Sequence, residues 1–292
     1  MLLPAHGADE RQGGGLMRLR SLLFVPGDRP DRMDKALGLG ADALILDLED
    51  SVAPARKAEA RAAVGALLAR KDRALPLLVR INPVGGPYAN DDLAALRELR
   101  PDGLVLPKAE GAATVHALSN WTGAPILPIA TETPAAIFEL GSYREVADRL
   151  LGLTWGAEDL PAAIGATAAR EADGRYTAPI ETVRALALFA AHAAKVPAIE
   201  TVYPDFRDLD GLAAYAARGA RDGFTGMMSI HPDQIAVINR AFTPSAAEIA
   251  AAQAIVDAFA ADPSAGVLAV DGKMVDAPHL AQARRLLDRA GR

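Results

Sequence analysis

The sequence predicts a single (β/α)8 TIM barrel with a C-terminal helical extension, an α/β fold. Eight short apolar segments rich in Leu, Val and Ile occur along the chain, and alanine-rich stretches with scattered charges separate them. Continuously apolar strands are typical of parallel sheets that are buried on both faces. No GxGxxG turn opens a helix after any of these segments, which favours a closed barrel over an open doubly wound sheet.

Strands and helices are expected to alternate through residues 20–241. The second predicted helix, 57–70, carries Ala60, Val64 and Leu67 on one face with charges opposite, which is an amphipathic pattern. The longest interval between strands holds an insertion over 162–176 and a further helix. The predicted strands are residues 21–25, 43–48, 77–81, 103–106, 126–130, 150–155, 198–202 and 225–230.

The domain organisation follows from these elements. We expect a flexible N-terminal tail over 1–19, a catalytic barrel over 20–241 and an extension over 242–292. After the eighth strand, the pattern predicts helices at 232–241, 244–261 and 278–289, with an irregular stretch at 265–276. This segment exceeds what a barrel needs, so we expect it to act as a lid or an oligomerisation arm.

Composition excludes several classes of protein. The formal net charge of -6 argues against a general nucleic-acid-binding protein. There is no cysteine, which removes disulfides, thiolate metal sites and cysteine nucleophiles and fits a reducing, cytoplasmic location. No apolar run reaches the roughly 18–20 residues of a membrane span, and the first 17 residues lack the apolar core of a secretory signal.

Polar side chains follow most of the predicted strands, where the active site of a barrel lies. Several acidic groups at one mouth would repel each other and raise each other's pKa unless a cation neutralised them. Oxygen ligands without cysteine or a histidine pair favour Mg²⁺, with Mn²⁺ as an alternative. These strand-end residues are Asp28, Arg29, Asp47, Glu49, Asp50, Arg80, Asn82, Lys108, Glu132, Glu158, Asp159 and His231.

Seven segments carry a resemblance to a known family. They are RSLLFVPG (20–27), ALILDLEDSV (43–52), LVRIN (78–82), LPK (106–108), ETPAA (132–136), WGAEDL (155–160) and IHPDQI (230–235). In this order and spacing they resemble the citrate lyase β-subunit-like family of the HpcH/HpaI aldolase superfamily, which includes malyl-CoA and citramalyl-CoA lyases. The resemblance covers nearly all of residues 20–290.

The resemblance implies a role for particular residues. Glu132 of the ET motif and Asp159 of the GAEDL motif would bind the metal, and Arg80 would grip the substrate carboxylate. The segment DGKMVDAPHL (271–280) is similar to a C-terminal segment whose aspartate, here Asp276, acts as the acid–base group and is commonly supplied by a neighbouring subunit. We therefore expect a homo-oligomer, a trimer or a hexamer.

Each assignment has a simpler alternative. Glu132 and Asp159 could cap helices or form salt bridges, and Arg80 could form a buried ion pair with Asp47 or Glu49. We expect Asp47 and Glu49 to accept hydrogen bonds from metal-bound waters rather than bind the metal directly.

Two further residues are assigned to the substrate. Asn82 shares the strand parity of Arg80, so both are expected to point the same way and bind substrate. Lys108 is also expected to bind substrate. A Schiff base at Lys108 is the competing mechanism, although nearby carboxylates would keep this lysine protonated.

The expected activity is Mg²⁺-dependent cleavage or condensation of a β-hydroxyacyl thioester, such as malyl-CoA or citramalyl-CoA, giving acetyl-CoA and an α-keto acid. Three alternatives stay open: a citrate lyase β subunit that acts on citryl groups of an acyl-carrier protein, a malyl-CoA thioesterase, and a non-catalytic interaction subunit. The residues do not choose among these thioesters, because a pocket's shape discriminates a single methyl group.

Overall fold

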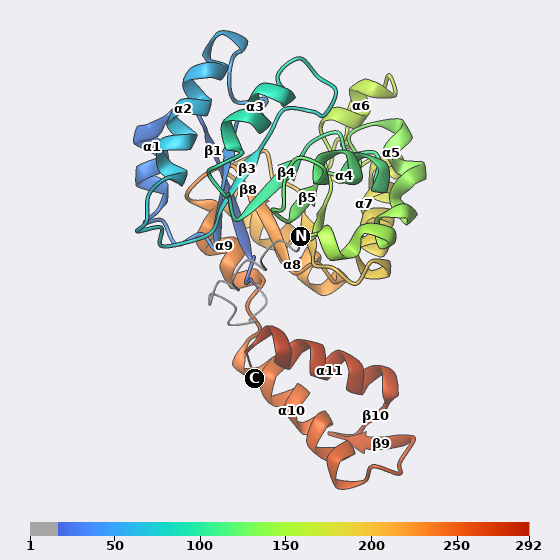
Figure 1. Cartoon of the computed structure of the whole chain (residues 1–292). Coiled ribbons are helices and arrows are strands. Elements are labelled where there is room, and N and C mark those ends of the chain that lie inside the picture. Colours follow the sequence, from blue (N-terminus) through green and yellow to red (C-terminus); the bar gives the residue numbers. More distant parts are fainter. Residues whose placement is uncertain (1–16, 292) are drawn as a thin grey trace, which may run out of the picture.

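The computed structural model describes residues 17–291 and contains all eight predicted barrel strands (Figure 1). Most of the predicted tail, residues 1–16, lies outside the described residues. The strands are β1 (Ser21–Pro26), β2 (Ala43–Asp47), β3 (Leu77–Arg80), β4 (Gly103–Leu106), β5 (Ile126–Pro128), β6 (Leu153–Thr154), β7 (Ala198–Glu200) and β8 (Gly226–Ser229).

The eight strands are parallel and form a nearly closed barrel. Their order is β5-β4-β3-β2-β1-β8-β7-β6, so sequential strands are neighbours and β1 pairs with β8. Between β5 and β6 the ring is completed by two isolated parallel bridges, Ile126 with Leu150 and Ile129 with Thr154. The predicted fold class is confirmed.

Side-chain alternation along the strands produces two apolar layers. Leu22, Ile45 and Leu78 belong to a cluster inside the barrel. Their chain neighbours Leu23 and Leu44 belong to the larger cluster between the strands and the surrounding helices. Because both faces are buried, each strand is continuously apolar, as parallel barrel strands require.

Helices cover the barrel in the order that the sequence predicts, and α2 buries Ala60, Val64 and Leu67 as expected. The helices around the barrel are α1 (Pro30–Ala36), α2 (Lys57–Leu68), α3 (Ala89–Leu96), α4 (Gly111–Ser119), α5 (Pro134–Glu139), α6 (Asp159–Ala163), α7 (Ala178–Ala193), α8 (Leu209–Asp222) and α9 (Gln234–Ala241). Two 3-10 helices, η1 (Pro54–Arg56) and η2 (Leu140–Arg149), complete this set. No helix among residues 17–291 has both the length and the apolar character to cross a membrane.

The barrel extends slightly past the predicted domain boundaries. Leu19, within the predicted tail, is buried in the apolar cluster inside the barrel. Phe242, within the predicted extension, is buried in the outer cluster, and the Thr243 hydroxyl accepts a hydrogen bond from Arg20 Nη1 at 2.9 Å. Both residues are held by packing that local patterns do not reveal.

The extension consists of two helices and a β-hairpin with a small apolar cluster of its own around Ala252, Ala283 and Leu287. Its elements are α10 (Ala246–Ala261), β9 (Val267–Val270), β10 (Lys273–Asp276) and α11 (Ala277–Arg289). The prediction of an irregular stretch over 265–276 is wrong, because this stretch forms the hairpin. In Figure 1 the extension projects from the end of the barrel opposite α6, so it does not cover its own barrel mouth.

Candidate functional site

A cavity of about 420 Å³ opens at the carboxyl ends of the barrel strands, where the sequence predicts the active site. Among the described residues, five acidic side chains line it and one cationic side chain, Arg80. The apolar remainder of its wall includes Phe24, Ile129 and Met228. Such an excess of negative charge favours a bound cation, because closely spaced carboxylates raise each other's pKa. The acidic lining residues are Asp47, Asp50, Glu132, Glu158 and Asp159.

Hydrogen bonds between the ends of β5 and β6 place Glu132 near the loop that carries Asp159. The Thr131 hydroxyl donates to the Gly156 carbonyl at 2.9 Å and accepts from the Gly156 N–H at 3.0 Å. A side chain at position 156 would not fit, because a β-carbon there would lie 2.9 Å from Glu132 Cγ. Neither Thr131, which adjoins the ETPAA motif, nor Gly156, which lies within WGAEDL, was predicted to have a role in the site.

Lys108 connects the two expected metal ligands. Its backbone N–H donates to Glu132 Oε2 at 2.6 Å, and its ammonium donates to Asp159 Oδ1 at 2.8 Å. The left-handed backbone of Lys108, with φ 49°, is uncommon for a residue with a side chain and accompanies this arrangement. Glu132 and Asp159 therefore both bind Lys108, one at its backbone and the other at its ammonium, whereas Glu158 is exposed.

The ammonium of Lys108 stays protonated. Burial lowers its pKa, but the hydrogen bond to Asp159 and the charges of Glu132 and Glu49 outweigh burial, and the net pKa is raised. A Schiff base needs a neutral amine. These surroundings therefore favour a lysine that acts as a fixed charge.

The donor set fits a hard divalent cation. Burial, together with the charge of Asp159, raises the pKa of Glu132 to about 7. Burial likewise raises the pKa of Glu49 to about 7, with Asp50 and Glu132 adding to the effect. Among the described residues Glu49 Oε2 forms no hydrogen bond, although it lies within ion-pair distance of Arg80. No group of three or more acidic or histidine side chains within 17–291 is arranged as a complete ligand set. Two carboxylates suffice for Mg²⁺, which keeps several waters.

Arg80 forms the buried ion pairs that the sequence left as an alternative. Its Nε and Nη2 donate to the two oxygens of Asp47, both at 2.7 Å. Its Nη1 lies 3.0 Å from Glu49 Oε2, and its guanidinium lies 4.7 Å from the ring centroid of Phe24. Asp47 thus fixes the orientation of a guanidinium that still lines the cavity. A substrate carboxylate at Nη1 would therefore have to share that nitrogen with Glu49.

The Asn82 side chain forms hydrogen bonds with residues of α2 and α3. Its amide N–H donates to Asp92 Oδ2 at 2.6 Å, and its carbonyl accepts from Lys57 Nζ at 2.8 Å. Lys57 also donates to the carbonyls of Leu48 and Glu49, at 2.7 and 2.9 Å. The expectation that Asn82 points with Arg80 is wrong, because β3 ends at Arg80 and strand alternation does not reach position 82. Asn82 and Lys57 instead support the turn that carries Glu49.

Asp276 lies apart from the other predicted residues within one chain. It ends β10 in the extension and caps α11 by accepting from the His279 backbone N–H. The helix α6, which begins at Asp159, lies at the opposite end of the molecule (Figure 1). Asp276 can therefore approach the cavity only if it comes from another copy of the chain or if the extension moves.

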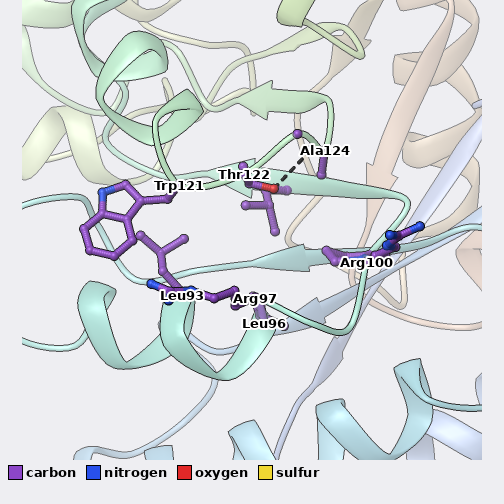
Figure 2. Close-up of a pocket in the computed structure, with 10 residues that line it drawn as sticks. Leu93, Leu96, Arg97, Arg100, Trp121, Thr122 and Ala124 are labelled. Atoms are coloured by element: carbon purple, nitrogen blue, oxygen red, sulfur yellow. Dashed lines mark hydrogen bonds between the residues drawn. The ribbon is translucent and has the colours of Figure 1, made fainter. Parts of the chain in front are cut away.

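A second cavity, of about 380 Å³, lies between α3 and the turn before β5, at the amino ends of the strands. Figure 2 shows Trp121 and Arg100 at its two ends, with Leu93 and Leu96 between them. Among residues 17–291, no acidic side chain lines this cavity. It therefore lacks the ligands of a metal site, and the cavity at the barrel mouth is the candidate active site.

Comparison with known proteins agrees with this geometry. Residues 20–232 match the model of the family described as HpcH/HpaI aldolase/citrate lyase. The chain belongs to this family. The chain is 39% identical to a citrate lyase subunit beta-like protein of Mycobacterium tuberculosis, over 92% of this chain and 94% of that protein.

Two further relatives bear on chemistry. The (3S)-malyl-CoA thioesterase of Cereibacter sphaeroides is 34% identical, over 93% of this chain and 94% of that protein. The solved structure of CitE from Mycobacterium tuberculosis in complex with magnesium, acetoacetate and coenzyme A superimposes with a TM-score of 0.82 at 37% identity, covering 94% of this chain and 98% of that one. Magnesium is thus bound in a homologous structure, and this chain belongs to a family of aldolases and lyases.

Proposed function

We propose that this protein is a Mg²⁺-dependent carbon–carbon lyase that cleaves a β-hydroxyacyl-CoA thioester, of the malyl-CoA or citramalyl-CoA type, into acetyl-CoA and an α-keto acid. One observation carries the proposal: Glu132 and Asp159 are held together by Lys108 beside an oriented Arg80, in a cavity with five acidic lining residues. The homologous complex with magnesium, acetoacetate and coenzyme A supports the same class of ligands.

Glu132 and Asp159 would hold the metal. When bound, Mg²⁺ supplies Lewis-acid stabilisation of the substrate oxygen that becomes the keto carbonyl. Asp47 holds Arg80 by two hydrogen bonds, so the guanidinium is already oriented when the substrate carboxylate arrives. A fixed donor lowers the entropic cost of aligning the carbon–carbon bond for cleavage.

Lys108 would serve as a fixed positive charge for the substrate. Its ammonium lies 2.8 Å from Asp159 and 3.7 Å from Glu49, so it offsets part of the acidic charge at the mouth. Asn82 would act on the substrate only through the turn that it supports. Asp47 and Glu49 lie beside the proposed ligands, where waters on the metal could donate to them.

During cleavage the β-hydroxyl loses a proton as the carbon–carbon bond breaks and the acetyl carbon gains one, so no net proton is consumed. Asp276 of the partner subunit would complete the site as the acid that protonates the acetyl carbon. The hairpin face that carries Asp276 supports an intermolecular contact. Cross-strand pairs put Asp276 opposite Val267 and Met274 opposite Ala269, so these four residues share one face. Val267 and Met274 are 57% and 62% exposed, which is typical of a surface that another chain covers. We therefore propose a homo-oligomer, a trimer or a hexamer.

A panel of acyl-CoA thioesters with and without Mg²⁺ tests the proposed reaction. Keto acid and free thiol are measured separately, because a lyase releases an α-keto acid whereas a thioesterase releases free CoA and the hydroxy acid. The similarity to a malyl-CoA thioesterase makes hydrolysis the second candidate. Keto acid formed only with Mg²⁺ supports the lyase. Activity that appears only with an acyl-carrier protein would instead identify a citryl-lyase subunit.

Mixing two inactive variants tests the partner's contribution. Asp276→Ala and Glu132→Ala each remove one half of the proposed composite site, so each should be inactive alone. A mixed oligomer contains some sites with an intact Glu132 from one chain and an intact Asp276 from the other, and partial activity should return after the subunits are exchanged. Persistent inactivity of oligomers proven to be mixed would contradict a composite site.

A further inference from the structure

A buried carboxylate that the proposed chemistry does not use, that of Glu200, binds the residue that precedes the segment 156–159. Glu200, the last residue of β7, has 0% exposure and lies next to Thr201, which lines the active-site cavity. Trp155, also 0% exposed, follows β6 and immediately precedes the cavity-lining segment 156–159. The Trp155 indole N–H donates to Glu200 Oε1 at 2.6 Å.

The carboxylate of Glu200 is fully surrounded by donors. Oε1 also accepts from the Tyr215 hydroxyl at 2.8 Å and from the Thr201 backbone N–H at 3.0 Å. Oε2 accepts from Arg184 Nε at 2.8 Å. A buried carboxylate with an ion-pair partner and several donors is rigidly placed, because any movement would leave a charged group without its hydrogen bonds. Glu200 is therefore a fixed point inside the barrel wall.

Among these donors, Trp155 is the one directly joined to the segment 156–159, which carries the proposed metal ligand Asp159. Arg184 lies on α7 and Tyr215 on α8, on the outer side of the barrel. Trp155 is four residues from Asp159, and its backbone is continuous with Gly156, which Thr131 fixes to the end of β5. The rings of Trp155 and Tyr176 also pack edge to face, with centroids 5.4 Å apart. Two separate contacts thus hold the beginning of this loop, one from β5 and one from β7.

We propose that Trp155 and Glu200 are positioning residues for the metal site. The hydrogen bond between the Trp155 indole and the Glu200 carboxylate sets the position of the segment 156–159 and hence of Asp159. This inference rests on the proposed metal site. The ordinary alternative is that the hydrogen bond only stabilises the barrel, as the Tyr215 hydrogen bond to the same oxygen would. The two roles make different predictions for metal binding.

A pair of matched variants separates them. Trp155→Phe keeps an aromatic ring but removes the N–H donor, and Tyr215→Phe removes the hydroxyl that donates to the same Glu200 oxygen. Mg²⁺ affinity is measured by titration calorimetry on the folded proteins, and thermal unfolding reports their stability. We expect Trp155→Phe to weaken Mg²⁺ binding about 10-fold, as outer contacts of metal ligands do, and Tyr215→Phe to change it by less than about 2-fold.

A spectroscopic readout is independent of activity and of the loss of ring volume. The chain has two tryptophans, so Trp155 is the only one in a Trp121→Phe background. We expect Mg²⁺ to change its fluorescence, and the change to disappear in Asp159→Asn. Unchanged Mg²⁺ affinity in Trp155→Phe, or equal weakening in Tyr215→Phe, would overturn the positioning role. A parent protein that binds Mg²⁺ no better than Glu132→Ala would instead refute the metal site itself.

Discussion

Replacing Gly156 by alanine tests the proposed metal site through a single added methyl group. A β-carbon at position 156 would lie 2.9 Å from Glu132 Cγ and 3.3 Å from Ile129 Cγ2. Ordinary contact begins near 3.4 Å, so Glu132 would have to move by about 0.5 Å, the difference between 3.4 and 2.9 Å. Gly156 does not have a positive φ, so alanine meets no backbone obstacle there. The perturbation is therefore confined to Glu132 and its neighbours.

The expected loss of metal affinity follows from that displacement. Metal–ligand distances are tolerated within about 0.2 Å, so a carboxylate shifted by about 0.5 Å no longer fits the site without rearrangement. We expect Gly156→Ala to weaken Mg²⁺ binding by about 10–100-fold, the range found when contacts that orient metal ligands are removed. The overpacking should also cost about 1–3 kcal/mol of unfolding free energy.

Calorimetric titration with Mg²⁺ measures the first effect, and urea unfolding measures the second. Gly123→Ala is the matched control, because a β-carbon there would have no atom within 4 Å. The control should bind Mg²⁺ as the parent protein does. If Gly156→Ala binds Mg²⁺ as tightly as the parent while remaining folded, Glu132 is not a ligand in the proposed arrangement.

Three further predictions concern charged groups of the site. Asp47→Asn should lower the unfolding free energy by about 3 kcal/mol at pH 7, because Arg80 keeps its charge in a buried place without its partner. Burial alone would raise the pKa of Asp47, but the hydrogen bonds and charge of Arg80 lower it below its usual value. The contribution of Asp47 to the free energy of unfolding is therefore complete above the unfolded pKa of about 3.9 and is lost as pH falls through the lower folded pKa. The stabilities of the parent and of Asp47→Asn should then converge in acid. Borohydride with pyruvate should leave Lys108 unmodified by mass spectrometry, and a trapped adduct would replace the metal mechanism by a Schiff base. Asp276→Ala should lower kcat at least about 100-fold and leave Mg²⁺ affinity unchanged, since a positioned acid contributes about that factor; a lost Mg²⁺ affinity would contradict a role confined to proton transfer.

The barrel could be predicted from the sequence because its strands are buried on both faces, which leaves a continuous apolar signature. The hairpin over 267–276 was missed although a signal exists. Asp271 and Gly272 both have positive φ, and Asp-Gly between two short apolar runs is typical of a tight hairpin turn. Each strand of the hairpin is only 4 residues long, which is too short for a clear apolar periodicity. Local turn chemistry would have identified what hydrophobic periodicity did not.

The site could be predicted to the level of which residues follow which strand, but not to the level of their partners. The ends of β3 and β5 do place Arg80 and Glu132 at the mouth. Alternation ceases where a strand ends, so the divergence of Asn82 from Arg80 could not be read from spacing. The contact between Trp155 and Glu200 joins residues 45 apart in the chain, and no local pattern encodes such a pair.

The charges of the cavity bear on the proposal that a second chain contributes to the reaction. The two cations beside the expected ligands, Arg80 and Lys108, both have raised pKa values and stay protonated near neutral pH. Glu132 and Asp159 are committed to the metal in the proposed site. The proposal assigns proton exchange with the acetyl carbon to Asp276, which sits on an exposed apolar hairpin face that its own barrel does not cover. Under this proposal the residue that caps α11 in one chain would act in the active site of another, so oligomerisation would serve the chemistry as well as stability.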